Sequence, residues 1–330
     1  MKSPLISIIV ATYNSSHVLR YAIQSVLDSD YQNWEMIIIG DYCTDDTESV
    51  VQSFDDSRIS FSNLDQNSGQ QAKPTNVALG KVRGDYITFL NQDDLFFKDH
   101  LSSCVEEIQK SGAEFMVIPG IKISPSIPQE LENNSFAAEM YAVHPKGEFS
   151  PHIFSIASTW FIHRDVPKKI GKWKMEKDAF VTPSQEWLFR AYTQNIRFHF
   201  PKKIGLLIIH SAERKGFYTE NSSYEHDYFF PRLNTLDLKS DLLEKAALKA
   251  AGDYNYLVFK SPHSLFRRII GAPFHLVLER LKIHPTSFRL YLKWKKRGRF
   301  ISHLKNIAEQ PKENQGEISQ KECYYSQKNP

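Results

Sequence analysis

The chain has 330 residues and a formal net charge of +3, with 41% hydrophobic and 24% charged residues. This balance is typical of a globular protein with one large domain, or one domain plus appendages. No stretch approaches the roughly 20 apolar residues of a membrane-spanning helix. The three scattered cysteines, Cys43, Cys104 and Cys323, exclude a disulfide framework and a zinc site with paired ligands, so we expect free thiols. The start runs directly into a strand-like segment without a signal peptide, which favours a cytoplasmic protein.

The first hundred residues alternate between short apolar runs and longer amphipathic segments, which predicts a parallel sheet wound with crossover helices. We expect strands at 5–10, 35–39, 59–61 and 86–90, and helices at 17–27, 45–54 and 70–82. A further helix at 101–110 and a strand at 115–118 extend the pattern. Right-handed crossovers then place ligand-binding residues at the carboxyl ends of the strands.

The rest of the chain is less regular. Prolines and polar residues at 124–151 predict a long surface loop over or beside the active site. Beyond it we expect a strand at 159–163, a helix at 185–193, a strand at 204–209 and a helical region at 236–251. The polar residues from 311 onward predict a disordered tail.

Two of the expected strands end in residues suited to binding a nucleotide. Tyr13 follows the first strand, where its ring could stack on a flat base, although helix capping by Asn14 or Ser15 explains the same segment equally well. Asp41 follows the second strand, where its carboxylate could accept hydrogen bonds from a base or ribose. Capping of the next helix accounts for Asp45 but explains Asp41 less well.

The fourth strand ends in two adjacent carboxylates, Asp93 and Asp94. These charges would repel one another unless protons or a cation compensated them, and hard oxygen ligands favour Mg²⁺ or Mn²⁺ bridging to phosphate oxygens. A solvated turn with helix-capping aspartates is the alternative.

Taken together, these segments resemble a family 2 glycosyltransferase of the GT-A fold, a Rossmann-like α/β fold with a mostly parallel sheet and flanking helices. The resemblance covers residues 4–101, and its ordered matches are Ser7-Ile8-Ile9-Val10-Ala11-Thr12-Tyr13-Asn14, Ala22-Ile23-Gln24-Ser25-Val26-Leu27, Asn33-Trp34-Glu35, Thr44-Asp45-Asp46-Thr47, Asn67-Ser68-Gly69 and Gly84-Asp85-Tyr86-Ile87-Thr88-Phe89-Leu90-Asn91-Gln92-Asp93-Asp94. It implies transfer of a sugar from a nucleotide diphosphate donor, most simply a UDP-sugar.

The resemblance also implies roles for residues. Tyr13 stacks on the base and Asp41 bonds to it, while Asp93, with Asp94 beside it, holds Mg²⁺ or Mn²⁺ on the diphosphate. The donor site implied in this way comprises Thr12, Tyr13, Asp41, Lys73 and Gln92. For Lys73, a solvated helix position is the alternative.

Two positions depart from the family pattern. Gly40 stands where the family often has an aspartate, and Asn91 replaces the first acid of the Asp-x-Asp motif, although its amide oxygen is still an acceptable ligand.

Later residues complete the expected machinery. Glu186 resembles the family's catalytic acid and could remove the proton from an acceptor hydroxyl with inversion of configuration, or could simply favour a helix N-terminus. His210 follows a strand where similar enzymes carry a metal-proximal histidine, and a structural histidine is the alternative. Trp160 and Trp187 could form a stacking platform for an acceptor sugar, or belong to the core.

The segment Lys260–Lys305 mixes lysines and arginines with aromatic and aliphatic residues, and Glu279 is its one acid. This pattern suits a helix on an anionic membrane surface, which would bring the enzyme to a lipid-linked acceptor; helices packed on the catalytic domain are the alternative. We expect no nucleic-acid partner, because no recognised module accompanies the charge.

We therefore predict a GT-A domain at 1–215, a helical basic extension at 216–310 and a tail at 311–330. The expected function is transfer of a sugar to a saccharide or lipid-linked hydroxyl in cell-envelope polysaccharide or lipopolysaccharide synthesis, in the cytoplasm or on the cytoplasmic face of the inner membrane. Alternatives are a non-catalytic nucleotide-sugar sensor or scaffold and a sugar-1-phosphate nucleotidyltransferase, although no glycine-rich phosphate loop supports the latter. The missing Gly-x-Gly-x-x-Gly disfavours a dinucleotide oxidoreductase.

Overall fold

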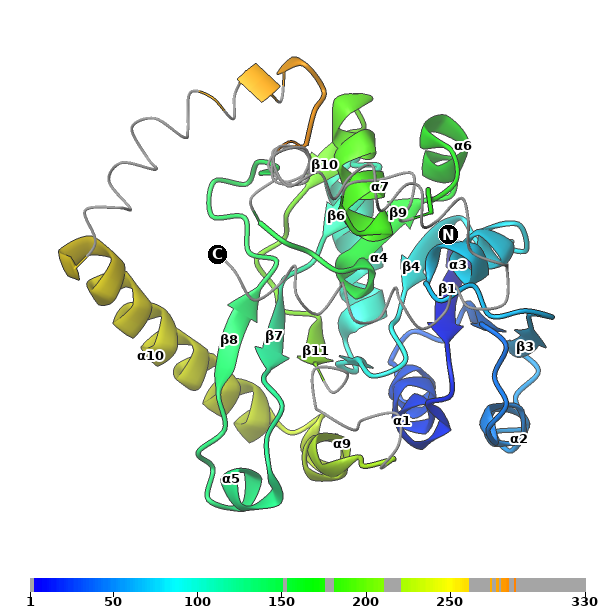
Figure 1. Ribbon diagram of the computed structural model, residues 1–330, viewed down its shortest axis with the longest axis horizontal. Helices are drawn as coiled ribbons and strands as arrows, with labels where there is room; N and C mark the ends of the chain where they lie inside the picture. Colours follow the sequence, from blue (N-terminus) through cyan, green and yellow to red (C-terminus); the bar gives the residue numbers. More distant parts are fainter. Residues whose placement is uncertain are drawn as a thin grey trace, which may run out of the picture.

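The computed structural model describes residues 3–150, 153–175, 181–210 and 221–260, and a few positions between 274 and 288. Within these ranges the chain forms two sheets flanked by helices (Figure 1). The larger sheet has the strand order β10-β6-β9-β4-β1-β2-β3, and the smaller has the order β5-β11-β7-β8. The predicted α/β class is therefore confirmed.

The N-terminal half of the larger sheet is parallel. Strand β1 (Ile6–Thr12) lies between β2 (Trp34–Gly40) and β4 (Tyr86–Phe89), and β3 (Ile59–Asn63) flanks β2. Strand β2 is buried along its whole length, which explains its apolar run, because a central parallel strand is covered on both faces. All four strands were predicted, with ends that differ by one or two residues.

The crossover helices follow the predicted order. They are α1 (Ser16–Leu27), α2 (Thr47–Gln52) and α3 (Ala72–Leu79). In α1 the residues Val18, Leu19, Ala22, Ile23 and Val26 are buried, and their helical spacing gives one apolar face toward the sheet. The parallel strands therefore end at a single edge of the sheet.

Antiparallel pairing extends the sheet on its other side. Strand β9 (Trp160–His163) lies antiparallel between β4 and β6 (Phe115–Val117), and β10 (Phe198–His199) completes this edge. The helices in this half are α4 (His100–Ser111), α6 (Val166–Ile170) and α7 (Pro183–Thr193).

The smaller sheet corrects one prediction. It consists of β5 (Leu95–Phe96), β11 (Leu206–Ile209), β7 (Gly120–Ile123) and β8 (Ala138–Tyr141). The segment 124–151, expected to be a loop, contains helix α5 (Pro128–Glu132) and strand β8, which pairs antiparallel with β7. Pro128 begins this helix instead of breaking it, because the first helical position needs no backbone N–H.

The last described elements pack against the smaller sheet. Helix α9 (Tyr224–Phe229) and the short η4 (Phe230–Arg232) lead into α10 (Leu236–Lys260), which runs beside β8 and extends beyond it (Figure 1). No helix in the described ranges is long and apolar enough to span a membrane. The basic segment Lys260–Lys305 lies largely outside the described residues, and the tail from 311 lies entirely outside them.

Candidate active site

A cleft of about 290 Å³ opens where β1, β2 and β4 end. Its walls come from the strand ends, from the segment before α3, and from α3 itself. The residues that line it are Ala11, Thr12, Tyr13, Asp41, Asn67, Gly69, Gln70, Gln71, Pro74, Asn91, Gln92 and Asp93. Parallel strands present ligand-binding residues at this edge because their chain directions agree. Of the predicted donor and metal residues, the cleft collects Thr12, Tyr13, Asp41, Gln92 and Asp93.

Gln92 joins the ends of β1 and β4. Its side-chain oxygen accepts hydrogen bonds from Thr12 Oγ1 at 2.8 Å and from the Tyr13 backbone N–H at 2.9 Å. An N–H group only donates, so the acceptor must be the amide oxygen of Gln92, which fixes the orientation of the amide. The NH₂ group of Gln92 therefore remains as the donor that this side chain can offer to a ligand.

Asp41 organises the wall opposite β4. Its side chain is 5% exposed, and its carboxylate accepts hydrogen bonds from the Ser68 backbone N–H, from Ser68 Oγ and from the Gly69 N–H, with the shortest at 2.8 Å. These bonds shape the loop before α3. Asp41 is thus both a cleft residue and the anchor of the loop beside it.

Gly40, the departure from the family pattern, has a packing reason. A Cβ atom at this position would lie 2.5 Å from Asn63 Oδ1 and 3.0 Å from Cys43 Sγ. The Asn63 side chain is held in place, because its Oδ1 accepts a hydrogen bond from the Cys43 N–H and its Nδ2 donates one to the Cys43 carbonyl. An aspartate at position 40 would require this contact to rearrange.

The two adjacent aspartates have different environments. Asp94 is 1% exposed, and its carboxylate accepts hydrogen bonds from Ser158 Oγ at 2.5 Å, Asn91 Nδ2 at 3.0 Å and the Ile209 N–H at 3.2 Å. Burial, and then the nearby charge of Asp93, raises the pKa of Asp94 well above its usual value. Three hydrogen bonds and burial make Asp94 an anchor of the turn, and its predicted role as a metal ligand stays a prediction.

Asp93 and Asn91 are residues of the cleft that could bind a divalent cation. Within the described ranges, no group of three or more His, Cys, Asp and Glu side chains is placed to hold a metal, so Asp93, Asp94 and His210 do not form such a site. Asp93 and Asn91 nevertheless both line the cleft, and both side chains carry oxygen atoms. Because Mg²⁺ is commonly held by one or two carboxylates plus substrate phosphates, this donor set suits a cation that arrives with a diphosphate.

Other predicted site residues lie elsewhere. Glu186, at the start of α7, is paired with Lys174 Nζ at 2.9 Å and with Arg190 at 2.5 Å, and it is not among the residues that line the cleft. Lys73 is exposed on α3, and its neighbours Pro74 on α3 and Gln71 just before the helix do line the cleft. Their predicted roles stay predictions.

The tryptophan platform is wrong. Trp160 and Trp187 are completely buried, and their rings stack on each other with centroids 5.8 Å apart. Trp173 and Phe89 pack against them, and Trp187 Nε1 donates to the Gly171 carbonyl at 2.8 Å. Both rings therefore stabilise the core and offer no surface to an acceptor. His210 follows β11, with its ring 6.2 Å from that of Tyr141, and a role beside the metal stays a prediction.

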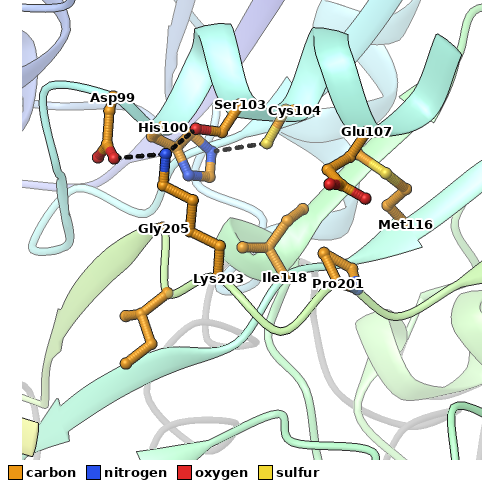
Figure 2. Close-up of a pocket in the computed structure, with 11 residues that line it drawn as sticks. Asp99, His100, Ser103, Cys104, Glu107, Met116, Ile118, Pro201, Lys203 and Gly205 are labelled. Carbon is orange, nitrogen blue, oxygen red and sulfur yellow. Dashed lines mark hydrogen bonds and ion pairs between the residues drawn. The ribbon is translucent and has the colours of Figure 1, made fainter. Parts of the chain in front are cut away.

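A second cavity, of only about 10 Å³, lies between α4 and the segment that enters β11 (Figure 2). Cys104 Sγ lies 3.8 Å from His100 Nε2 there. Burial raises the pKa of the Cys104 thiol and lowers that of His100 to about 3. A protonated thiol beside a neutral ring is not an activated nucleophile, so this pair has a packing role.

Sequence reasoning did not assign part of the cleft. The lining residues Asn67, Gly69, Gln70, Gln71 and Pro74 were missed as ligand contacts, although Asn67-Ser68-Gly69 belonged to the matched motifs. Ser158 and His226, which contact the acidic turn, gave no local signal.

Comparison with known proteins identifies similar sequences. The model of the family described as "Glycosyl transferase family 2" matches residues 7–171. A putative teichuronic acid biosynthesis glycosyltransferase of Bacillus subtilis is 37% identical over 114 residues, 34% of this chain and 45% of that protein. An Escherichia coli UDP-Glc:alpha-D-GlcNAc-diphosphoundecaprenol beta-1,3-glucosyltransferase is 34% identical over 116 residues, 35% of this chain and 46% of that protein. The chain thus spans about half the length of these relatives.

Solved structures show the same fold. Residues 1–349 of Staphylococcus aureus TarS, in complex with UDP-GlcNAc, superpose with a TM-score of 0.52 at 18% identity, covering 89% of this chain and 92% of that one. A mannosyltransferase of Pyrobaculum calidifontis, in complex with GDP-Man and Mn²⁺, gives 0.50 at 15% identity, covering 89% and 87%. The predicted GT-A fold is confirmed.

Proposed function

Since the chain belongs to glycosyl transferase family 2, we propose that it transfers a sugar from a nucleotide diphosphate donor to a hydroxyl acceptor. One observation carries the proposal: Asp41 follows β2, Gln92 and Asp93 follow β4, and these parallel strands on either side of β1 bring all three residues to a single cleft. A nucleotide sugar needs a surface for its base, donors for its polar atoms and compensation of its phosphate charge. In the same cleft Tyr13 offers the surface, Gln92 offers the donor, and Asp93 offers a ligand for a cation that would compensate the charge.

We propose the following roles for the residues of the cleft. The ring of Tyr13 stacks on the base, beside Asp41, and the NH₂ group of Gln92 donates to the nucleotide. Asp93, with the amide oxygen of Asn91, holds a divalent cation against the diphosphate. The cation would offset the negative charge of the departing nucleoside diphosphate.

Glu186 is the proposed base that removes the acceptor proton with inversion at the anomeric carbon. Arg190 bonds both Glu186 oxygens and the carbonyl of Ile170, which holds the carboxylate at a fixed position near the start of α7. Lys174 approaches the same carboxylate and is half exposed.

The acceptor and the setting are also proposed. Relatives are named for teichuronic acid biosynthesis and for a diphosphoundecaprenol-linked substrate. A saccharide or lipid-linked hydroxyl in cell-envelope polysaccharide synthesis, a UDP-sugar donor and a cytoplasmic location fit these names. We retain the proposed division into 1–215, a basic extension at 216–310 that contacts an anionic membrane, and a tail at 311–330.

A non-catalytic nucleotide-sugar sensor is the second candidate. It is favoured by Asn91, because a neutral amide at this position contributes no negative charge to the cleft. The Asn91 amide nitrogen donates a hydrogen bond to Asp94. Such a protein would bind donors without turning them over.

Release of nucleoside diphosphate from UDP-, GDP- and dTDP-sugars tests the function, with Mn²⁺ or Mg²⁺ and a diphosphate-linked lipid saccharide as acceptor. The proposal expects turnover that Asp93→Asn abolishes and Glu186→Gln reduces at least ~100-fold. Glu132→Gln is the matched control, because Glu132 is an exposed acid on α5. Donor binding without turnover would instead establish the sensor, and release of pyrophosphate would indicate a nucleotidyltransferase.

A further inference from the structure

Helix α9 places a histidine directly behind the acidic turn. His226 is completely buried, and its Nε2 lies 2.9 Å from the backbone oxygen of Asp93, 133 residues earlier in the chain. A carbonyl oxygen only accepts, so Nε2 must carry the proton and donate it. The Tyr21 ring of α1 stacks on this imidazole, with centroids 5.5 Å apart and planes at 28°.

The histidine is held by its neighbours on α9. Glu225 is completely buried and accepts a hydrogen bond from the Ser126 N–H at 2.9 Å. Asp227 accepts hydrogen bonds from the Tyr21 hydroxyl and, at 2.8 Å, from Ser223 Oγ. Contacts on either side of His226 therefore fix α9 to the segment between β7 and α5 and to α1.

The rest of the acidic turn is anchored from other directions. Gln92 bonds the end of β1, and the Asp94 carboxylate bonds Ser158 and the N–H of Ile209 on β11. The Asp93 peptide lies between these anchors, and His226 bonds its carbonyl. A peptide fixed in this way limits the directions in which the attached side chain can point.

We propose that His226 is a positioning residue, which holds the Asp93 peptide so that its carboxylate is oriented for a divalent cation bound with the donor diphosphate. This inference rests on the proposed function. Groups that orient metal ligands typically change metal affinity 10- to 100-fold when lost, and we expect about 10-fold because the bond is to the backbone.

Electron paramagnetic resonance of free Mn²⁺, with UDP or GDP present, measures the affinity. His226→Phe keeps a planar ring but removes the donor, and should weaken Mn²⁺ binding about 10-fold while nucleotide affinity without metal stays unchanged. His226→Gln places an N–H donor near the Nε2 position and should restore most of the affinity. Phe229→Leu is the matched control, because Phe229 is equally buried on α9 and belongs to an apolar cluster.

Tyr21→Leu is a second test at a half-buried position, for the case that His226→Phe does not fold. It removes the stacked ring and the bond to Asp227, and should lower Mn²⁺ affinity about fivefold, because one hydrogen bond is typically worth about 1 kcal/mol. Unchanged Mn²⁺ affinity in either variant overturns the positioning role and leaves the proposed function intact. Failure of the unmodified protein to bind Mn²⁺ with any nucleotide overturns the proposed metal site, and this inference with it.

Discussion

The carboxylate of Asp41 bonds Ser68 twice, at 3.0 Å from the backbone N–H and at 2.8 Å from the hydroxyl. The two residues are 27 positions apart, and Ser68 lies between Asn67 and Gly69, which line the cleft together with Asp41. The loop before α3 therefore takes its shape from a residue at the end of β2. Any ligand that enters here meets a wall that this carboxylate has ordered in advance.

Ser68→Ala removes the hydroxyl bond but keeps the backbone bond to Asp41. One such bond is worth about 1 kcal/mol, so the affinity for the bound nucleotide should fall about fivefold. Titration calorimetry measures the change. Ser53→Ala, which loses a comparable hydroxyl bond to the Val50 carbonyl on α2, should leave affinity unchanged. Equal affinities for Ser68→Ala and the unmodified protein would show that this anchor does not support the ligand.

Asp93 and Asp94 should respond differently to neutral substitution. Asp94→Leu removes the acceptor from three donors, two of them buried, and should lower the free energy of unfolding by about 3 kcal/mol or more, measured by urea denaturation. Asp93→Asn should alter stability by less than about 1 kcal/mol but remove Mn²⁺-dependent nucleotide binding. The reverse pattern would contradict the assignment of anchor and ligand.

The free energy of unfolding should decrease as the pH is lowered, and His100 should contribute to this decrease. Burial lowers its pKa to about 3, whereas an unfolded histidine titrates near ~6.5. Below that pH the unfolded chain takes up a proton that the native ring does not, so unfolding becomes easier by about 1.4 kcal/mol per pH unit. His100→Gln should remove this contribution between pH 6 and pH 4. Equal slopes of unfolding free energy against pH in the two proteins would contradict it.

Other groups do not affect that comparison. Burial also lowers the pKa of His226, to about 4, which reduces stability as the pH falls. Burial raises the pKa of Asp94, which has the opposite effect on stability. Both remain in His100→Gln, so the difference between the two slopes isolates His100.

Gly205 should tolerate no side chain. A Cβ atom there would lie 2.3 Å from His100 Nδ1 and 2.8 Å from Ile118 Cγ2, both in the packed region of Figure 2. Gly205→Ala should therefore cost about 1–3 kcal/mol of unfolding free energy. Gly80→Ala, where the nearest atom would be at 3.4 Å, should change it by less than about 0.5 kcal/mol. Similar melting temperatures for the two variants would contradict the packing argument.

Periodicity located the strands that build the cleft, because β1 and β2 are long apolar runs that end in polar residues. Strand β8 escaped prediction because only Ala138 of its four residues is fully buried, and its partner β7 and helix α10 supply the rest of its environment. Short strands of this kind depend on tertiary contacts more than on their own pattern.

The sequence does not distinguish the roles of two residues of the same type when only their three-dimensional surroundings differ. Asp93 and Asp94 are adjacent carboxylates, and what separates them is burial and the donors Ser158 and Ile209, which come from distant parts of the chain. In the same way, nothing near His226 in the sequence indicates that it contacts Asp93.

Nucleotide binding measured by calorimetry with and without Mn²⁺ tests the central claim most directly, namely that the cleft at the strand ends holds a nucleotide diphosphate through Asp93. We expect at least one of UDP, GDP and dTDP to bind ~10-fold or more tightly with Mn²⁺, a gain that Asp93→Asn removes and Glu132→Gln keeps. A Mn²⁺-dependent gain that survives in Asp93→Asn would contradict the claim, as would the absence of binding by all three nucleotides.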